Sequence, residues 1–570
     1  MIVDAHDFPN GQMLTADVCI VGAGAAGIAM ALELIETGID VIVLESGGLK
    51  DDRKTQSLYA GTVADERLHS PIDRYRQRRY GGSTTIWGGR CMPFDPIDFE
   101  ARDYVPHSGW PLGIDALMPF YPKANRICEA GEFAYNIGAA FKLSTHPMIE
   151  GFESTHFTSD TLERFSCPTD FGARYGHKLR AAANVRMVLH ANVTGLRLNA
   201  SGSAVESVSV ATLAGKNFSV RAGHVVLATG GLEVVRLLLA SRDVKPKGIG
   251  NDHDVVGRYY MCHIAGTIGT LQFDRPLGSV WHGYDVSDEG IYCRRRLALT
   301  ADAQRRLGIG NFIARLHHPR ITDPAHRTGI LSLLYLAKLF IPYEYGKRLH
   351  GEEKADLRTW LQHLRNVITD PFYTVAFLWH WLRDRTLPER KFPSVIIRSR
   401  ANRYSLDFHA EQEPNPESRV TLSNECDVLG MPKLHVDWRY TAGDMETVKR
   451  ALSLLADDIR QSGIGRFDYD PAAVEIEMTR YGAYGGHHIG TARMGNDPRS
   501  SVVDTDCRVH GVENLYVASA AVFPTSSQAN PTLTIVAIAL RLATHLRARH
   551  EQATPGHAAA LAGVAAENIA

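Results

Sequence analysis

Apolar runs separated by glycine-rich turns organise the first part of the chain. Asp17 to Val21 is an apolar run typical of a buried strand, Ile28 to Glu36 has helical composition, and Val41 to Glu45 is a second strand-like run. Val185 to Asn192 and His224 to Ala228 also have strand character, and the latter leads into another helical stretch. Strands that alternate with helices predict an α/β unit of the Rossmann type.

The turn after the first strand has the spacing of a dinucleotide-binding motif. Gly22 makes the tight turn, Gly24 lets the backbone approach a pyrophosphate, and Gly27 lets the helix pack on the strand. The helix N-terminus faces the phosphates, and Glu45 can accept hydrogen bonds from ribose hydroxyls. A glycine-rich structural turn is the alternative. Because two later Gly-x-Gly segments lack a third glycine and a preceding strand, we expect a single, tightly held cofactor.

A second glycine-rich segment runs from Tyr80 to Arg90, where four glycines surround small hydroxyl residues. Such a segment lets the backbone lie flat against a ligand, although an ordinary surface loop would have the same composition. We therefore treat it as a candidate wall of the cofactor site.

The C-terminal stretch from Tyr481 to Leu546 holds the candidate catalytic groups. A Gly-flanked histidine pair places His487 four residues before Thr491, and Asn530 directly precedes Pro531 at the start of a long apolar helix. Polar groups on loops between regular elements are typical of an active site. An Asn before Pro at a helix start also has a purely local explanation, because Asn caps helices and Pro tolerates the first turn.

The middle of the chain, from Met261 to about Val474, mixes strand-like runs with helices. Ser394 to Ile397 and Leu434 to Trp438 are predicted strands, and Asp444 to Gln461 is a predicted helix. This region is the expected substrate domain, an antiparallel sheet with helices.

Within this region, Arg327 to Arg385 is helical and rich in aromatic residues, with Lys338 and Lys347 beside apolar residues at helical spacing. Core packing under the substrate site is the favoured interpretation of this stretch. A lid, or a surface that touches a membrane or a redox partner, is the alternative.

Length and composition narrow the class of protein. A chain of 570 residues is too long for one ordinary core, so two or more lobes are expected. With Lys+Arg 62 and Asp+Glu 63, the formal charge of −1 gives no electrostatic footprint for nucleic acid. The eight cysteines show no C-x-x-C spacing, which argues against metal ligation or a disulfide framework and favours a reducing compartment.

The location of the protein is a weaker inference from the same sequence. The N-terminus lacks the basic start and apolar region of a signal peptide, and no apolar run reaches the roughly 20 residues that a membrane span needs. We therefore expect a cytoplasmic protein, with membrane association as the less favoured alternative.

Together, four motifs resemble the glucose–methanol–choline (GMC) flavoprotein oxidoreductases. They are the turn from Gly22 to Gly27, the GGSTTIWGG segment, the run Pro414 to Arg419 with the preceding Glu411-Gln412, and HHIGTARMG through NPTLT. The resemblance extends from about Asp17 to Leu546, and the motifs occur in the family's order.

The resemblance implies an α/β fold, with a Rossmann-like FAD-binding domain and an inserted α+β substrate domain built on an antiparallel sheet. The implied boundaries are 1–260 and 481–550 for the two parts of the FAD-binding domain, 261–480 for the substrate domain and 551–570 for a tail. His487 matches the family's active-site base and Asn530 its second active-site position, whereas His488 is interpreted as a turn or packing residue. The implied cofactor-binding residues are Gly22, Gly24, Ala25, Ala26, Gly27, Glu45, Ser46, Gly82, Ser83, Thr84, Thr85, Trp87, Val193, Ala228, Thr229, Gly230, Ala518, Asn530, Pro531 and Thr532.

Departures from the family pattern refine these expectations. Some relatives carry a flavin-linked histidine near the position of Ile86, and an alkyl side chain cannot form that bond, so we expect non-covalent FAD. Trp87 and the run Ser108 to Leu112 are similar to the pyranose-oxidase and fructose-dehydrogenase branch. This similarity favours a sugar, glycoside or polyol as the substrate.

Three classes of function remain open on this basis. The first is an FAD-dependent alcohol oxidoreductase, acting on a sugar or on another alcohol, with oxygen, a quinone or a redox protein as the electron acceptor. The second is a non-redox GMC-like lyase, and the third is a binding or assembly subunit without turnover. The presence of both His487 and Asn530 argues against the third.

Overall fold

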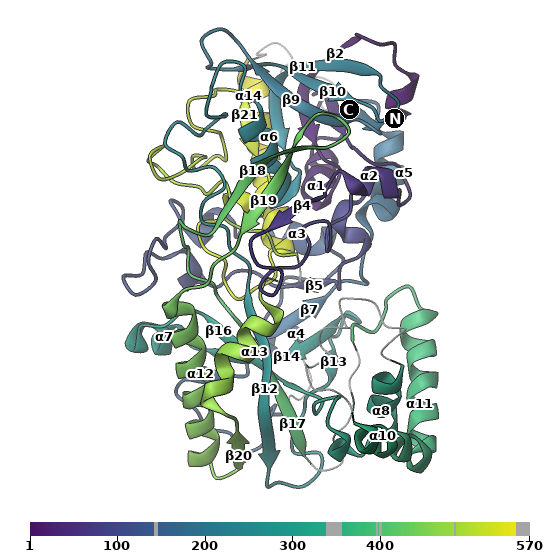
Figure 1. Cartoon of the computed structure of the whole chain (residues 1–570), viewed down its shortest axis with the longest axis vertical. Helices are drawn as coiled ribbons and strands as arrows, with labels where there is room; N and C mark the ends of the chain where they lie inside the picture. Colours follow the sequence, from purple (N-terminus) through teal and green to yellow (C-terminus); the bar gives the residue numbers. More distant parts are fainter. Residues whose placement is uncertain are drawn as a thin grey trace, which may run out of the picture.

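The computed structural model describes residues 1–141, 146–337, 356–394, 397, 399, 402–483 and 486–553. These residues form two halves that are stacked along the long axis of the molecule, with the chain passing between them several times (Figure 1). Among the described residues, no helix is both long and apolar enough to cross a membrane. The predicted tail lies largely outside the described residues.

The upper half is built on a sheet in the order β1-β8-β3-β2-β11-β10-β9, with β21 paired to β11. Strands β1, β8, β3, β2, β11 and β21 are mutually parallel, whereas β10 pairs antiparallel to β11 and β9 pairs antiparallel to β10. All four residues of β3 are buried, as in a parallel sheet that is covered on both faces. The strands are β1 (Ile2–Asp4), β2 (Met13–Val21), β3 (Val41–Leu44), β8 (Val185–Leu189), β9 (Asn192–Leu198), β10 (Val205–Ala211), β11 (Asn217–Leu227) and β21 (Leu515–Val517). The predicted α/β fold is confirmed.

One predicted strand is wrong in its extent. The run Val185 to Asn192 is two strands, β8 and β9, because His190 between them adopts a left-handed backbone conformation with φ of 57°. A left-handed residue turns the chain and ends the strand. The Nδ1 atom of His190 lies 2.8 Å from a carboxylate oxygen of Asp4, a contact that no local pattern encodes.

The lower half contains an antiparallel sheet in the order β20-β12-β17-β16-β15-β6, as predicted for the substrate domain. Its strands are β6 (Phe157–Thr158), β12 (Ile264–Phe273), β15 (Leu297–Leu299), β16 (Phe312–His317), β17 (Arg403–Ala410) and β20 (Gly465–Asp468). A smaller antiparallel sheet joins β13 (Tyr284–Val286), β14 (Tyr292–Arg295), β7 (Leu162–Phe165) and β5 (Arg90–Cys91). Helix α12 (Ala442–Gln461) packs against β20, β16 and β17.

Strand pairing crosses the predicted domain boundaries in two places. Strands β18 (Arg419–Cys426) and β19 (Pro432–Asp437) pair with β4 (Gly61–Val63) in the upper part of the molecule (Figure 1). Conversely, β6 and β7 precede residue 260 but belong to the sheets of the lower half. The boundaries at 260 and 480 therefore stay a prediction, while the interleaving of the two halves is a feature of the structure.

The helices cover these sheets and connect them. Helix α1 (Ala25–Glu33) packs against the C-terminal helix α14 (Thr532–Ala553), and α6 (Gly230–Ala240) contacts β9, β18 and β19. The remaining helices are α2 (Arg53–Ser57), α3 (Tyr121–Ile127), α4 (Ile137–Ala140), α5 (Phe171–Ala181), α7 (Ala301–Leu307), α8 (Gly329–Leu336), α10 (Leu357–Thr369), α11 (Pro371–Trp381) and α13 (Val474–Tyr481).

The predicted core role of the aromatic stretch is wrong for α10 and α11, whereas α8 is largely buried. The Phe372 side chain on α11 is 90% exposed and that of Trp379 is 61% exposed. The buried residues Ile330, Leu331 and Ile397 form a small cluster of their own, separate from the main core. Residues 338–355, which include Lys338 and Lys347, and two of the four residues of the predicted strand from Ser394 to Ile397 lie outside the described residues.

The turn between β2 and α1 depends on close backbone contact. Gly22 has a φ of 102°, which favours glycine, and a Cβ atom on Gly27 would lie 1.9 Å from the Gly22 carbonyl oxygen. Gly27 therefore allows α1 to pack directly on the turn that begins the cofactor motif.

Replacing Gly27 by Ala should lower the free energy of unfolding by about 1–3 kcal/mol, because the added methyl group forces α1 away from this turn. Thermal unfolding followed by circular dichroism measures the change. Gly113→Ala is the matched control, since a Cβ there meets no atom within 4 Å and the φ of −81° is ordinary. Equal unfolding temperatures for the two variants would contradict the tight contact at Gly27.

Candidate active site

A long cavity opens at the carboxyl ends of the parallel strands β2, β3, β11 and β21, the position where open α/β sheets bind ligands. Its lining includes most of the predicted cofactor-binding residues: Gly22, Gly24, Ala25, Ala26, Glu45, Ser46, Gly82, Ser83, Thr84, Trp87, Val193, Ala228, Thr229, Gly230, Ala518, Pro531 and Thr532. Of the remaining predicted residues, Gly27, Thr85 and Asn530, all described, lie outside this lining. We call it the cofactor cavity.

The residues of the cofactor cavity fit a large polar ligand. Thr229 Oγ1, Arg78 Nε and His488 Nε2 are buried, line the cavity and have no hydrogen-bond partner among the described residues. Unpartnered polar atoms are costly unless a ligand or water satisfies them. A Cβ atom on Gly82 would lie 2.9 Å from the Gly24 Cα. The absence of side chains on these two glycines therefore allows the two segments of the lining to approach closely. The N-terminus of α1 also directs free N–H groups to this region.

Glu45, the predicted ribose-binding acid, is fixed in place by the backbone. Its carboxylate accepts hydrogen bonds from the backbone N–H groups of Ala23 at 2.9 Å and Gly47 at 2.8 Å. Burial raises the pKa of this carboxyl group above its usual value. Each carboxylate oxygen has two acceptor sites, so capacity for a ligand hydroxyl remains.

Two arginines in the cofactor cavity were missed in the sequence analysis. Arg76 and Arg78 line the cavity, and their Nη1 atoms lie 3.4 Å and 3.0 Å from the carboxylate of Glu233 on α6. They bring positive charge to a site whose lining also holds Glu45, Glu233, Arg236 and Asp427. Their only sequence signal is a run of arginines just before the glycine-rich loop, which also fits a solvated surface.

A second cavity lies on the side of the antiparallel sheet and shares part of its wall with the first. The residues common to both are Ser83, Trp87, Gly486, His487 and Thr532. His487 therefore lies at the junction of the two cavities. Polar residues in the rest of the lining of the second cavity include Arg90, Arg294, His317, Asp407, His409 and Asn530, beside apolar residues such as Ile86 and Phe165. We call it the substrate-side cavity.

The two predicted catalytic residues are close together. The Asn530 side-chain amide nitrogen lies 3.3 Å from Nε2 of His487. Asn530 Oδ1 is buried and has no hydrogen-bond partner among the described residues. Burial lowers the pKa of His487 well below its usual value, and His263 and Arg90 lower it further. The imidazole is therefore neutral at pH 7.

His263 is a site residue that was missed in the sequence analysis. Its Nδ1 lies 2.7 Å from Nδ1 of His487, and its Nε2 lies 3.2 Å from the Ser526 carbonyl oxygen. Burial lowers the pKa of His263 to about 4. His263 and His487 are 224 positions apart in the chain, so no local spacing could have joined them.

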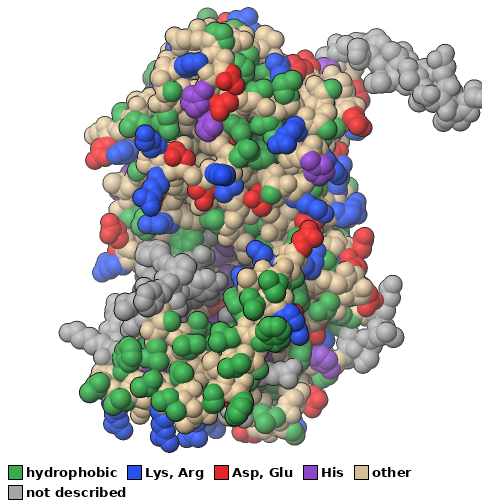
Figure 2. All heavy atoms as spheres, turned by 90° about the vertical axis from the view of Figure 1, so that its right-hand side faces the viewer, with side chains coloured by type: hydrophobic (Ala, Val, Ile, Leu, Met, Phe, Trp, Pro, Cys, Tyr) green, Lys and Arg blue, Asp and Glu red, His purple; other side chains and the backbone are tan. Residues whose placement is uncertain are grey.

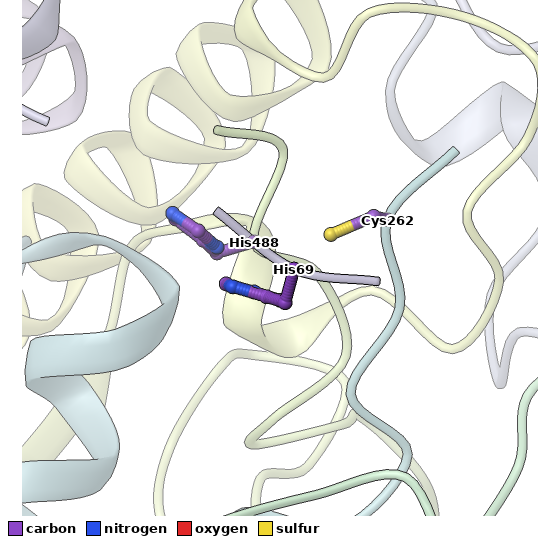
Figure 3. A group of neighbouring side chains, drawn as sticks. All are labelled: His69, Cys262 and His488. Atoms are coloured by element: carbon purple, nitrogen blue, oxygen red, sulfur yellow. The ribbon is translucent and has the colours of Figure 1, made fainter. Parts of the chain in front are cut away.

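His488 points away from this pair, into a buried cluster with His69 and Cys262 (Figure 3). The Tyr260 hydroxyl lies 2.8 Å from His69 Nε2 and 2.7 Å from His488 Nδ1. Because His69 Nδ1 lies 2.5 Å from the Ser70 carbonyl, His69 donates there and accepts at Nε2 from Tyr260. Tyr260 then accepts from His488, which leaves a lone pair on His488 Nε2 in the cofactor cavity. The hydroxyl that bridges the two rings makes the cluster a hydrogen-bond network.

A buried ionic cluster stands behind the substrate-side cavity. Arg315 donates to Glu163 at 2.6 Å and to Asp407 at 3.0 Å, and Arg90 lies 3.6 Å from Glu163. Burial alone would raise the pKa of Glu163, but Arg315 and Arg90 outweigh it and lower the pKa to about 2. Burial also lowers the pKa of Arg90 to about 10. These ion pairs thus hold the side chains of Arg90 and Asp407, which line the cavity, in position.

Known proteins resemble this chain over most of its length. The family model for FAD dependent oxidoreductases matches residues 17–335, more than half of the chain, and the GMC oxidoreductase model matches residues 414–539. Paromamine 6'-oxidase from Streptomyces fradiae is 26% identical over 563 residues, which cover 92% of this chain and 90% of the relative. Fructose dehydrogenase large subunit from Gluconobacter japonicus is 25% identical, covering 94% of this chain and 98% of the relative.

A solved structure has the same fold. Pyridoxine 4-oxidase from Mesorbium loti superposes with a TM-score of 0.56 at 19% identity, over 93% of this chain and 99% of that one. The chain belongs to the GMC family of FAD-dependent oxidoreductases. It is an enzyme, and its cofactor is FAD.

Proposed function

We propose that this enzyme oxidises a CH–OH group of a sugar, glycoside or polyol to a ketone or aldehyde. The observation that carries the proposal is the position of His487, which faces both the cofactor cavity and the polar substrate-side cavity. A donor hydroxyl bound there meets a neutral imidazole on one side and the cofactor site on the other. This is the arrangement that coupled removal of a proton and a hydride requires.

The residues of the cofactor cavity hold FAD in this proposal. The α1 N-terminus and Arg78 offer N–H groups and positive charge to the pyrophosphate, and Glu45 accepts from ribose hydroxyls. When bound, FAD supplies a hydride acceptor, the flavin N5 atom. The chain's own residues bind and orient the donor and remove its proton.

The hydrogen-bond partners of His487 support its Nε2 atom as the base in this proposal. The Ser526 carbonyl can only accept, so His263 carries its proton on Nε2 and, being neutral, accepts at Nδ1. His487 must then donate from Nδ1, which leaves the lone pair on Nε2 next to Asn530. Nε2 takes the substrate hydroxyl proton while the Asn530 amide N–H stabilises the same oxygen.

The polarity of the substrate-side cavity supports a polyhydroxylated donor. Arg90, Arg294 and Asp407 offer charged groups, and the buried Nδ1 of His409 has no hydrogen-bond partner among the described residues. A sugar presents several hydroxyls that could satisfy such groups. The names of two relatives, paromamine 6'-oxidase and fructose dehydrogenase large subunit, agree with a sugar-like substrate.

A non-redox GMC-like lyase is the second candidate, because it would need the same cofactor cavity and the same base. Anaerobic mixing with a panel of sugars, polyols and simple alcohols separates the two. Bleaching of the flavin absorption band by one class of donor supports the oxidoreductase. A band that stays unchanged while a product forms supports the lyase, and a simple alcohol as the best donor excludes the sugar.

The acceptor of the electrons is oxygen, a quinone or a redox protein. Comparing peroxide formation with dye-coupled turnover on one good donor distinguishes an oxidase from a dehydrogenase. A cytoplasmic location remains part of the proposal, on the basis of eight free cysteines, seven of them buried.

We expect FAD to be held without a covalent bond, because Ile86, which lines the substrate-side cavity, has no nucleophilic atom. Acid precipitation should release the flavin into the supernatant. Yellow colour that stays in the pellet and fluoresces after denaturing gel electrophoresis would contradict this expectation.

Removing the base should slow flavin reduction without loss of cofactor. We expect His487→Ala to retain FAD and to be reduced about 10² to 10⁴ times more slowly than wild type. His488→Ala is the neighbouring control and should lose much less, while Asn530→Ala should fall between them because it removes only one hydrogen bond. Anaerobic stopped-flow absorption measures all three rates. An inactive His488→Ala beside a nearly normal His487→Ala would overturn the assignment.

His263 is expected to act as a positioning residue for His487. His263→Phe removes the acceptor for the Nδ1–H group and frees His487 to protonate Nε2, so flavin reduction should slow about tenfold or more. His263→Gln offers an amide oxygen as acceptor and should recover much of the rate. Nitrogen NMR of labelled histidine reports the tautomer directly. An equal loss of rate in both variants, with an unchanged tautomer of His487, would contradict the positioning role and leave His263 as a packing residue.

A further inference from the structure

Helices α10 and α11 expose apolar side chains, whereas the surface helices of a globular protein usually bury theirs against the core. On α10, the exposed side chains Leu357, Leu361, Leu364 and Ile368 recur at the spacing of one helical face. The buried side chains of the same helix, His363 and Asn366, are polar. A helix that contacts only the rest of its own chain buries its apolar face. The exposed apolar face of α10 therefore requires another explanation.

The polar inner face of α10 is held by specific hydrogen bonds. His363 Nδ1 lies 3.0 Å from the Ser332 hydroxyl of α8, and the Asn366 amide donates to that hydroxyl at 3.1 Å and to the Pro324 carbonyl at 2.8 Å. These contacts fix the rotation of α10 about its axis. The outward apolar stripe is therefore a consequence of satisfied buried polar groups.

Helix α11 also exposes apolar side chains, although Tyr373 and Phe377 on its other side pack against the cluster of Ile330 and Leu331. Phe372, Val375 and Trp379 are exposed at helical spacing, and Leu382, in the helical turn directly after α11, continues the row. Hydrophobic side chains gather over this lower part of the molecule, with Lys, Arg, Asp and Glu side chains along the lower edge (Figure 2). We define the exposed apolar residues of these two helices, with Trp360, as the helical patch. Such a contiguous apolar surface marks an interaction site.

We propose that the helical patch seats the enzyme on the surface of a lipid bilayer. Bulky Leu, Ile and Phe side chains at the centre, with Trp360 and Trp379 among them, match the interfacial layer of a membrane. Arg358 and Arg365 are both exposed and, seven residues apart, lie on one side of α10 beside the stripe. Their charge complements anionic headgroups, which favours a bilayer over an apolar protein partner.

The dimensions of the helices fit a surface position. Helix α10 has 13 residues and α11 has 11. At about 1.5 Å per residue, neither reaches the roughly 30 Å of a hydrocarbon core, so both would lie in the plane of the interface.

The helical patch is connected to the wall of the substrate-side cavity. Phe392, shortly after α11, packs edge-on against Tyr284 with ring centroids 5.1 Å apart, and Pro393, Ser394 and Tyr284 line that cavity. Phe392 also packs against His380 of α11. Contact with a bilayer would therefore affect the segment that lines the substrate-side cavity.

Vesicle binding by the flavin-loaded enzyme tests the proposal. With vesicles of phosphatidylcholine plus phosphatidylglycerol, the protein should float with the lipid, and it should bind at least several-fold more weakly to phosphatidylcholine alone. Brominated lipid should quench part of the tryptophan fluorescence of the wild type. The double variant Trp360→Phe, Trp379→Phe should remove that part, because five of the seven tryptophans of the chain lie outside the helical patch. No flotation and no quenching with the anionic vesicles would overturn the proposal.

Variants localise the contact. The double variant Phe372→Gln, Trp379→Gln should weaken vesicle binding about tenfold or more, because two large apolar side chains are lost from the contact. Val428→Gln is the control, since Val428 is 80% exposed in the turn between β18 and β19. Equal binding by the double variant and the control would contradict the role of the patch. Sedimentation velocity tests the alternative that a second copy of the chain occupies the patch. A wild-type dimer that the double variant abolishes, together with no vesicle binding by the wild type, would support this alternative and overturn the proposal.

Discussion

The hydrogen bond between Nδ1 of His487 and Nδ1 of His263 is the contact on which the geometry of the site depends. His263 directly precedes β12 of the antiparallel sheet, and His487 lies in the C-terminal segment that also closes the cofactor cavity. The contact therefore joins the two halves of the molecule at the point where their cavities meet. If one half shifted relative to the other, the direction of the His487 lone pair would change with it.

Burial gives this pair its chemical character. The pKa of both imidazoles is lowered because the protonated ring would lose its hydration, and the positive charge of Arg90 adds to the effect. Two neutral rings can share one hydrogen bond only if one donates and the other accepts. The Ser526 carbonyl decides which, since it can only accept from His263. A backbone group thus determines the tautomer of a side chain that it does not touch.

Local patterns predicted the parts of the site that depend on local geometry. Gly22, Gly24 and Glu45 were found because a tight turn and a strand end need particular residues at fixed spacing, and His487 and Asn530 came from the resemblance to a family. His263, Tyr260 and Arg78 could not be found in this way, because their roles arise from contacts between distant segments. Helices α10 and α11 of the aromatic stretch depart from the predicted core role for a related reason: their composition suits a core, but the hydrogen bonds of His363 and Asn366 turn the apolar face of α10 outward.

The most direct test of the account is the pH dependence of anaerobic flavin reduction in the wild-type enzyme at saturating donor. In the proposed mechanism only neutral His487 accepts the proton, and burial lowers its pKa well below the usual value, so the rate should be constant from about pH 6.5 upward and should fall only in more acidic solution. An ordinary imidazole would give a rise in the rate centred near pH 6.5. Burial of His487 moves this rise to lower pH. A rate that continues to climb through pH 8 would contradict the account, because the base would then be a group that is still protonated where His487 is already neutral.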